Sequence, residues 1–393
     1  MNIEKINAQM AEYLRTREMV CGALVIRRNG EVILNQTYGC LDAAGKQPVT
    51  EDTIFRLASM TKPVTAVAVM QLIERGKLGL DDELAQYIPE FSEMHVVADK
   101  RYAYSGQSLK KVVWMMVTFN RKNFVTVPAE RRITIRDLLS HSSGLEEGLV
   151  GFILMLRMKY KDDTLETRAL KYATQPLDFH PGSSAAYSPL AGFDILARLV
   201  EIVSGKSFTG YTSENIFIPL GMKDATFYPT PAQEARIPRL YLYRKGRLKD
   251  MTGTAKDVSG IARSGPRYPS ASGGLYASIK DYDRFVQMLV NEGELDGIRI
   301  LKPETVRLMH TEAAYKHLEP QPGLVWGLGM SIRQDPEKAK SFARKGTYGW
   351  SGHFGTHFFI SPKDHLSVVF LMNRAEIGGG NYISVKLEEL VFE

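Results

Sequence analysis

Residues 53–73 read TIFRLASMTKPVTAVAVMQLI, and the pattern changes once along this stretch. Thr53 to Arg56 favours a strand, whereas the run from Val64 to Ile73 is apolar and typical of a buried helix. Ser59 stands between them, at the expected helix N-terminus. Free amide groups and the helix dipole there favour a developing negative charge. We therefore expect a strand, a short turn carrying Ser59, and a buried helix.

The turn contains Ser59-Met60-Thr61-Lys62, an S-x-x-K pattern. Residues three apart share a helix face, so the Lys62 amine can reach the Ser59 oxygen. A serine hydroxyl becomes a strong nucleophile when a neighbouring base takes its proton, and S-x-x-K is a known acyl-enzyme signature. The alternative is that Ser59 only caps the helix. A second copy, Ser108-Leu109-Lys110-Lys111, lies in a polar basic stretch and is interpreted as solvated surface.

Composition is that of a soluble globular protein. The 393 residues are 44% hydrophobic and 24% charged, enough for a large two-lobed unit. The net charge of +6 comes from basic residues scattered along the chain, with no stripe that interleaves them with aromatic residues. We therefore expect a small-molecule substrate and no nucleic-acid partner. The oligomeric state is left open by the sequence.

Targeting signals and disulfides are not expected. No apolar run approaches the roughly 20 residues that a membrane span needs. Residues 1–18 lack the apolar core of a secretory signal. Cys21 and Cys40 flank an Asn29-Gly30 turn, but pairing across that turn sets Cys21 opposite Tyr38. We therefore expect a reduced, cytoplasmic protein with no membrane contact.

The two ends of the chain indicate a sheet, and the middle indicates helices. Expected strands, each pair joined by a hairpin, are Cys21 to Ile26 with Val32 to Tyr38, and Thr356 to Ser361 with Leu366 to Met372. Expected helices are Ile135 to Leu139, Leu165 to Ala173, Leu190 to Val203 and Tyr282 to Val290. The predicted class is α+β: an antiparallel sheet from both ends, flanked by helices, with an inserted, mainly helical lobe.

The predicted division is one lobe of residues 1–80 plus 265–393 and a second, mainly helical lobe of residues 81–264. Glu93 to Arg131 is less regular than its surroundings and carries an apolar patch. It is either a lid over a cleft between the lobes or a packed helix, and packing is favoured.

Metal and cofactor signatures are missing from the sequence. The eight histidines show no metal-ligand spacing, and Ser204-Gly205-Lys206-Ser207 lacks the upstream glycine of a P-loop. Gly349 to His353 falls one glycine short of G-x-S-x-G. His141, just past an expected helix, is interpreted as a cap for carbonyl groups. We predict no metal and no cofactor.

Two further segments fit a serine enzyme without a catalytic histidine. Tyr187-Ser188-Pro189 opens the helix from Leu190, and a phenol beside an ammonium group can carry protons because the positive charge stabilises phenolate. Tyr348 to Thr356 leads into the C-terminal strands, and its glycines allow a substrate to approach the strand closely.

Together these segments resemble the serine β-lactamase and penicillin-binding-protein superfamily, most closely the family VIII carboxylesterases of its class C-like branch. The resemblance covers nearly the whole chain. Besides Ser59 to Lys62 it includes Leu138 to Leu145, Gly205-Lys206-Ser207-Phe208, Pro219-Leu220-Gly221-Met222, Ser272-Gly273-Gly274-Leu275 and Tyr348 to Thr356.

The resemblance implies a β-lactamase/transpeptidase-like fold and a mechanism. Ser59 would attack the carbonyl carbon, while Lys62 and Tyr187 take its proton and pass one to the leaving group. The backbone amides of Ser59 and His353 would form the oxyanion hole. Water would then hydrolyse the acyl-enzyme. The substrate would lie against the segment Trp350-Ser351-Gly352.

Two departures from the family pattern indicate the substrate. β-Lactamases and peptidases of the superfamily have asparagine where this chain has Pro189, and lysine where it has Trp350. Losing an amide-binding side chain and a carboxylate-binding cation favours neutral esters. We therefore predict a carboxylesterase for small to medium acyl groups. The alternatives are an acyltransferase or a β-lactamase/D-peptidase of the same fold, and a non-catalytic binding protein.

Overall fold

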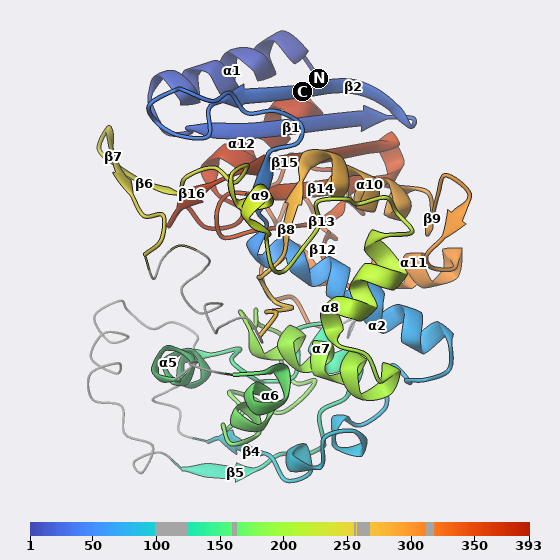
Figure 1. Cartoon of the computed structure of the whole chain (residues 1–393). Coiled ribbons are helices and arrows are strands. Elements are labelled where there is room, and N and C mark those ends of the chain that lie inside the picture. The colour runs from blue at the N-terminus through green and yellow to red at the C-terminus, as the bar shows by residue number, and fades with distance from the viewer. Residues whose placement is uncertain (99–124, 159–162, 255–256, 258–267, 312–317) are drawn as a thin grey trace.

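The computed structural model describes residues 1–98, 125–158, 163–254, 257, 268–311 and 318–393 (Figure 1). Its helices are α1 Ile3–Arg15, α2 Thr61–Glu74, α4 Ile135–Leu139, α5 Leu149–Arg157, α6 Leu165–Ala173, α7 Ala191–Ser204, α8 Phe208–Thr212, α9 Pro231–Glu234, α10 Ile279–Val290, α11 Pro303–Met309 and α12 Tyr382–Phe392.

Its strands are β1 Cys21–Arg28, β2 Glu31–Gly39, β3 Ile54–Arg56, β4 His95–Val97, β5 Thr126–Pro128, β6 Tyr241–Arg244, β7 Arg247–Asp250, β8 Tyr276–Ser278, β9 Glu294–Leu295, β10 Ile298–Arg299, β11 Leu324–Trp326, β12 Ser331–Arg333, β13 Tyr348–Ser351, β14 His357–Ser361, β15 Leu366–Met372 and β16 Arg374–Ala375.

The principal sheet joins both ends of the chain. Its seven strands run in the order β11-β12-β13-β14-β15-β1-β2, and every neighbouring pair is antiparallel. Strand β1 of the N-terminal hairpin therefore pairs with β15, more than 300 residues later in the sequence. This confirms the predicted α+β class and the antiparallel sheet built from terminal segments.

Alternate residues of the strands face two different layers. Leu24, Phe359 and Phe370 face α1 and α12, in a cluster that also holds Ile6 and Leu387. Figure 1 draws α1 at the top of the view and labels α12 below it, beside β15. Lys5, in the first turn of α1, forms an ion pair with Glu393, which follows α12, at 3.0 Å. This layer closes one face of the sheet with both ends of the chain.

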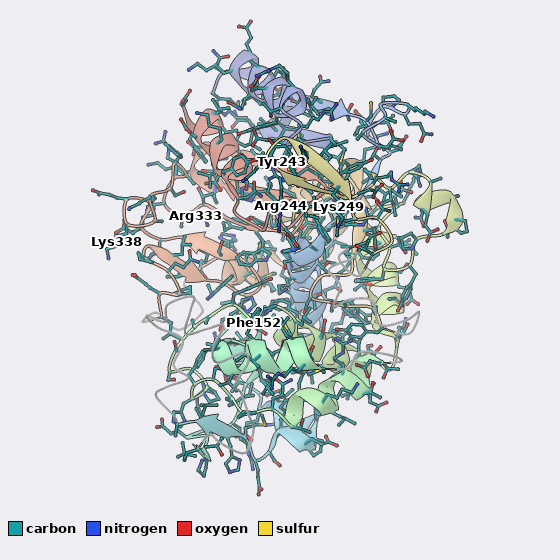
Figure 2. The ribbon with its side chains drawn as sticks, turned by 90° about the vertical axis from the view of Figure 1, so that its left-hand side faces the viewer. Phe152, Tyr243, Arg244, Lys249, Arg333 and Lys338 are labelled. Carbon is teal, nitrogen blue, oxygen red and sulfur yellow. The ribbon has the colours of Figure 1, made fainter. Side chains whose placement is uncertain are left out.

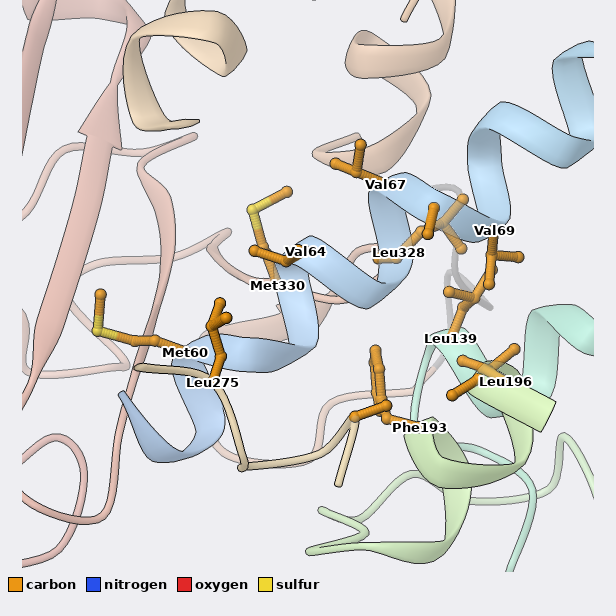
Figure 3. Packing of buried hydrophobic residues seen from close by; sticks show 14 of the residues in the cluster. Met60, Val64, Val67, Val69, Leu139, Phe193, Leu196, Leu275, Leu328 and Met330 are labelled. Atoms are coloured by element: carbon orange, nitrogen blue, oxygen red, sulfur yellow. The ribbon is translucent and has the colours of Figure 1, made fainter. Parts of the chain in front are cut away.

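The opposite face packs on α2 and α10, and α2 continues into the core between the sheet and the other helices (Figure 1). Every residue of α2 from Thr61 to Leu72 is buried. A helix that is apolar all round is a core helix, which is why the run starting at Val64 has no polar stripe. Figure 3 shows Val64, Val67 and Val69 projecting from α2 among Leu139, Phe193, Leu196, Leu275, Leu328 and Met330.

The lower part of Figure 1 holds α5, α6 and the short ladder β4–β5. That ladder occupies the two described ends of the segment from Glu93 to Arg131. The question of a lid or a packed helix concerns residues 99–124, which lie outside the described residues. The predicted division into lobes at residues 80 and 265 stays a prediction.

Most expected elements are present within a few residues of their predicted bounds, and α4, α6 and β15 match them fully. One detail of register was wrong. Cys21 pairs with Gly39, and Tyr38 pairs with Gly22, because a bulge beside Ile26 shifts the β1–β2 ladder by one residue. Both cysteines are still free thiols. Within the described ranges, no helix has the length and apolar character needed to cross a membrane.

Candidate active site

Ser59 lies in a single 3-10 turn, Ala58–Met60, between β3 and α2. Ala58 has a φ of +48°, in the left-handed region, where a residue with a Cβ atom is strained by about 1–3 kcal/mol. Neighbouring side chains hold the turn. The Thr61 hydroxyl donates to the Ala58 carbonyl at 2.7 Å, and the Tyr282 hydroxyl donates to the Met60 carbonyl at 2.8 Å. The strained turn thereby fixes the position of the intervening serine.

The Ser59 side chain does not cap the helix. Met60 is the N-cap residue of α2, and no side chain makes a capping hydrogen bond there. Instead, Ser59 Oγ lies 2.6 Å from the Tyr187 hydroxyl, within hydrogen-bonding distance. The alternative in which Ser59 only caps the helix is therefore wrong, and a serine and a tyrosine 128 residues apart share a hydrogen bond.

Lys62 is fully buried one helical turn after Ser59. Its ammonium group donates to the carbonyls of Pro189 at 2.8 Å and Ser272 at 2.9 Å, and its Nζ lies 4.9 Å from the centre of the Tyr187 ring. An ammonium has three N–H donors, so one remains after these two bonds. No carboxylate within the described ranges forms an ion pair with Lys62, so its charge is stabilised by carbonyl dipoles and aromatic faces.

The carbonyl of Ser272 is itself held in place by a buried carboxylate. The Ser272 amide donates to Asp194 Oδ1 at 3.1 Å, and the Tyr268 hydroxyl donates to the same carboxyl group. Asp194 lies in the first turn of α7, so this helix supports Lys62 through the Ser272 loop.

The amides of Ser59 and His353 are available for a ligand. Both residues line one cleft, and neither amide donates a hydrogen bond to another residue in the part of the chain that the structure describes. Gly352 brings the two segments together. A Cβ atom at Gly352 would collide with the Leu57 carbonyl and the Thr356 hydroxyl. Only glycine permits this approach of the β13 end to the serine turn.

Aromatic rings form one wall around the serine. The Trp350 ring centre lies 5.3 Å from that of Tyr187 and 4.7 Å from that of Trp326. The position that carries lysine in the family pattern is thus filled by an indole facing the tyrosine. The indole N–H groups of both tryptophans are buried and have no acceptor among the described residues. Trp326 was not predicted from the sequence, because no motif surrounds it.

His141 does not cap a helix, contrary to the sequence-based expectation. Its Nδ1 accepts a hydrogen bond from the Ser188 amide at 3.1 Å, and its ring lies 5.0 Å from that of Tyr187. Burial and the nearby charge of Lys62 hold the pKa of His141 well below its ordinary value. A neutral His141 therefore fixes the backbone beside Tyr187 without adding a second positive charge.

Two buried glutamates follow the His141 turn. Glu146 Oε2 accepts from the Ala191 amide at 3.1 Å, whereas Oε1 is buried without a partner among the described residues. Burial, with repulsion from Asp194 and Asp178, raises the pKa of Glu146 to about 8. Glu147 accepts hydrogen bonds from Ser143 and the next amide, and burial raises its pKa as well. We infer that Glu146 is protonated at neutral pH and ties this turn to the start of α7.

Ser351 lies on the face of β13 opposite to Trp350, since successive side chains alternate along a strand. Its Oγ is 2.8 Å from His357 Nδ1, and His357 Nε2 is 3.0 Å from Glu388 Oε1. This arrangement has no signal in the sequence, because its three members come from β13, β14 and α12.

The site opens into a cleft of about 900 Å³. Ser59, Tyr187, Trp350, Ser351 and His353 line it, whereas Lys62 and Gly352 lie behind its wall. Two other residues that line the cleft are labelled in Figure 2, where Phe152 of α5 lies below Arg333 of β12. No cluster of three His, Cys, Asp or Glu residues suited to a metal ion occurs within the described ranges.

Comparisons with known proteins identify the family and the fold of this chain. The family model described as Beta-lactamase matches residues 6–382. Esterase EstB of Burkholderia gladioli is 28% identical, with 99% of this chain and 94% of the relative covered. Among solved structures, "EstCE1, a hydrolase with promiscuous acyltransferase activity" matches with a TM-score of 0.77, at 24% identity over 100% of this chain and 98% of that one.

A third match is the octameric penicillin-binding protein homologue from Pyrococcus abyssi, with a TM-score of 0.71 at 22% identity. It covers 100% of this chain and 77% of that one. The fold is therefore β-lactamase/transpeptidase-like, as the motifs predicted. With a family match that spans almost every element described above, the chain belongs to the Beta-lactamase family of serine hydrolases.

Proposed function

We propose that this protein is a carboxylesterase that forms an acyl-enzyme on Ser59. The observation that carries the proposal is the 2.6 Å contact between Ser59 Oγ and the Tyr187 hydroxyl, beside the buried ammonium of Lys62. A hydroxyl nucleophile next to a proton-accepting group, itself oriented by a third group, is the arrangement that acyl transfer requires.

The reaction follows from these contacts. Tyr187 reacts as the phenolate, whose negative charge lies beside the Lys62 ammonium. Ser59 Oγ attacks the ester carbonyl carbon, and the Ser59 proton passes to the phenolate oxygen of Tyr187. The amides of Ser59 and His353 then donate to the oxyanion of the tetrahedral intermediate, each contributing about 3 kcal/mol to transition-state stability. The departing alcohol takes the proton from Tyr187. In the second half, water attacks the acyl carbon and returns a proton by the same path, which restores the Ser59 hydroxyl.

Esters are favoured over β-lactams and D-alanyl peptides by two side chains. Pro189 contributes its backbone carbonyl to Lys62 and has no side-chain amide for a substrate amide. Trp350 presents an indole beside Tyr187 where a cation would attract a carboxylate. The similarity to Esterase EstB over 99% of the chain points in the same direction. A neutral ester whose acyl group packs against the tryptophans fits this wall.

The test is hydrolysis of p-nitrophenyl butyrate by the wild type, Ser59→Ala and Ser108→Ala. The third protein is a matched control, because Ser108 begins the second S-x-x-K copy of the chain. We expect kcat/KM to fall by roughly a thousandfold or more in Ser59→Ala and to stay at the wild-type value in Ser108→Ala. Equal rates in all three proteins would reject Ser59 as the nucleophile.

Acyl transfer is the second candidate function. A cleft of about 900 Å³ has room for an acceptor alcohol beside the acyl group, and the structurally similar EstCE1 is described as having promiscuous acyltransferase activity. Adding a primary alcohol to the p-nitrophenyl butyrate assay separates the two outcomes. A hydrolase releases butyrate throughout, whereas a transferase forms the new ester in proportion to the alcohol added.

A further inference from the structure

The cleft continues around the edge of β13 to the face of the sheet covered by α12. The pairing of β12 with β13 ends at Gly349, so the strand edge is open at the next two residues. There Trp350 faces Tyr187, and Ser351 faces α12. Both side chains line the same cleft. We call the second part, lined by Ser351, His357, Glu388 and Arg333, the α12 subsite.

Three side chains of this subsite form a chain of hydrogen bonds. Ser351 and His357 are cross-strand partners in the β13–β14 ladder, with Oγ and Nδ1 2.8 Å apart. On the other side of the ring, His357 Nε2 lies 3.0 Å from Glu388 Oε1. Arg333 and Ser341 also donate to the Glu388 carboxyl group, each at 3.4 Å.

The charge on Glu388 determines the direction of these bonds. Burial opposes ionisation of the carboxyl, but the hydrogen bond from His357 and the charge of Arg333 outweigh it and hold the pKa of Glu388 below its ordinary value. An ionised carboxylate only accepts hydrogen bonds, so His357 Nε2 carries the proton. When the ring carries only this proton, Nδ1 is an acceptor, and the Ser351 hydroxyl donates to it. The lone pairs of Ser351 Oγ are left for a ligand in the cleft.

Hydrogen-bond donors lie next to this acceptor. A Cβ atom at Gly379 would be 3.0 Å from Ser351 Cβ, so the loop 378–380 packs directly against the serine. Gly379 and Gly380 line the cleft, and their amides make no hydrogen bond within the described ranges. The guanidinium of Arg333 is close by and disfavours a second cation.

We propose that the α12 subsite binds a hydroxyl group carried by the substrate away from its scissile carbonyl. This rests on the esterase function proposed above. A hydroxyl both donates and accepts, so it can donate to Ser351 Oγ and accept from an amide of the glycine loop. Ser351 is thus a specificity residue for hydroxylated esters, and His357 and Glu388 are positioning residues that present its oxygen as an acceptor.

The same three residue types form catalytic triads in other hydrolases, which gives a sharp alternative. If the Ser351 oxygen were a nucleophile, a fluorophosphonate would label it in a Ser59→Ala protein. We expect no label on Ser351 there. A labelled Ser351 would overturn the acceptor role assigned to it.

The direct test measures binding without turnover, in the Ser59→Ala protein, by calorimetry. The ligands are matched pairs with and without a terminal hydroxyl: ethyl hexanoate with ethyl 6-hydroxyhexanoate, and hexyl butyrate with 6-hydroxyhexyl butyrate. The first pair carries the hydroxyl on the acyl part and the second on the alcohol part. A single net hydrogen bond predicts that Kd is about five- to tenfold lower for the hydroxylated member of one pair.

Further substitutions in this background locate the effect. Adding Ser351→Ala removes the preference, and adding Glu388→Gln reduces it, because the amide no longer fixes the proton on His357 Nε2. The matched control is Ser361→Ala on β14, whose hydroxyl donates to Asp364 at 2.6 Å, and which keeps the preference. Equal Kd values within both pairs, or a preference that survives Ser351→Ala, would overturn the subsite. Failure of the wild type to hydrolyse either kind of ester would instead reject the esterase function.

Discussion

Replacing Glu146 by glutamine should make the stability of this protein less dependent on pH. The Glu146 carboxyl is buried, and among the described residues one of its oxygens has no partner while the other accepts a backbone hydrogen bond from Ala191. Burial and the charges of Asp194 and Asp178 raise its pKa from 4.5 to about 8. The native state therefore binds this proton more tightly than the unfolded chain does.

The sign and size follow from linkage between proton binding and folding. The contribution of the protonated carboxyl to stability is complete below the unfolded pKa and is lost as pH rises towards the folded pKa. Between these values each pH unit lowers the free energy of unfolding by about 1.4 kcal/mol. From about pH 5 to about pH 8 the wild type should lose about 3.5 kcal/mol through Glu146 alone. Glu146→Gln is uncharged throughout and lacks this loss.

Urea unfolding of both proteins at intervals of one pH unit measures the difference. Asp281, whose pKa burial raises to about 6, is not among the groups that shift Glu146, so its titration is common to both proteins and cancels in the comparison. We expect the difference in unfolding free energy between variant and wild type to grow steadily in favour of Glu146→Gln as pH rises. Parallel curves would refute the reasoning, because they would mean that Glu146 is ionised in the native state at neutral pH.

Three predictions concern the reaction itself, measured as p-nitrophenyl butyrate hydrolysis. Tyr187→Phe keeps the ring but removes the hydroxyl that lies 2.6 Å from Ser59 Oγ. We expect kcat/KM to fall about a hundred- to ten-thousandfold with little change in Tm. A variant with wild-type rates would show that Tyr187 does not carry the proton. Lys62→Met leaves two buried carbonyls without donors, so it should lower both activity and Tm; an active, fully stable variant would contradict both roles. Gly352→Ala should lower kcat about a hundredfold, because the new Cβ atom would push β13 away from the Leu57 carbonyl and so from the serine turn. An unchanged kcat would show that catalysis does not need this close approach.

The parts of the site that the sequence predicted are those with a local pattern. Ser59 and Lys62 lie three residues apart, and the apolar run after them implies a buried helix without further information. Tyr187 and Trp350 lie far from them in the chain. Tyr187 was proposed as a proton carrier at the start of a predicted helix, and the family resemblance then supplied its place in the mechanism and the role of Trp350.

The remaining contacts could not be predicted, because they join residues that no local pattern connects. His141 lies 47 residues before Ser188, whose amide donates a hydrogen bond to it. Glu388 lies 31 residues after its hydrogen-bond partner His357. Isolated histidines and glutamates carry no periodic signal, so the cap interpretation of His141 was the simplest available. The one-residue bulge beside Ile26 is likewise invisible in an alternating strand pattern, and it shifted Cys21 from Tyr38 to Gly39.

The central claim is that Ser59 is the nucleophile of an acyl-enzyme. Its most direct test is mass spectrometry of the intact protein after exposure to a fluorophosphonate, for the wild type, Ser59→Ala and Ser108→Ala. We predict one covalent adduct on the wild type and on Ser108→Ala, located on the peptide that contains Ser59, and none on Ser59→Ala. An adduct that persists in Ser59→Ala, or a wild type that takes none, would contradict the account.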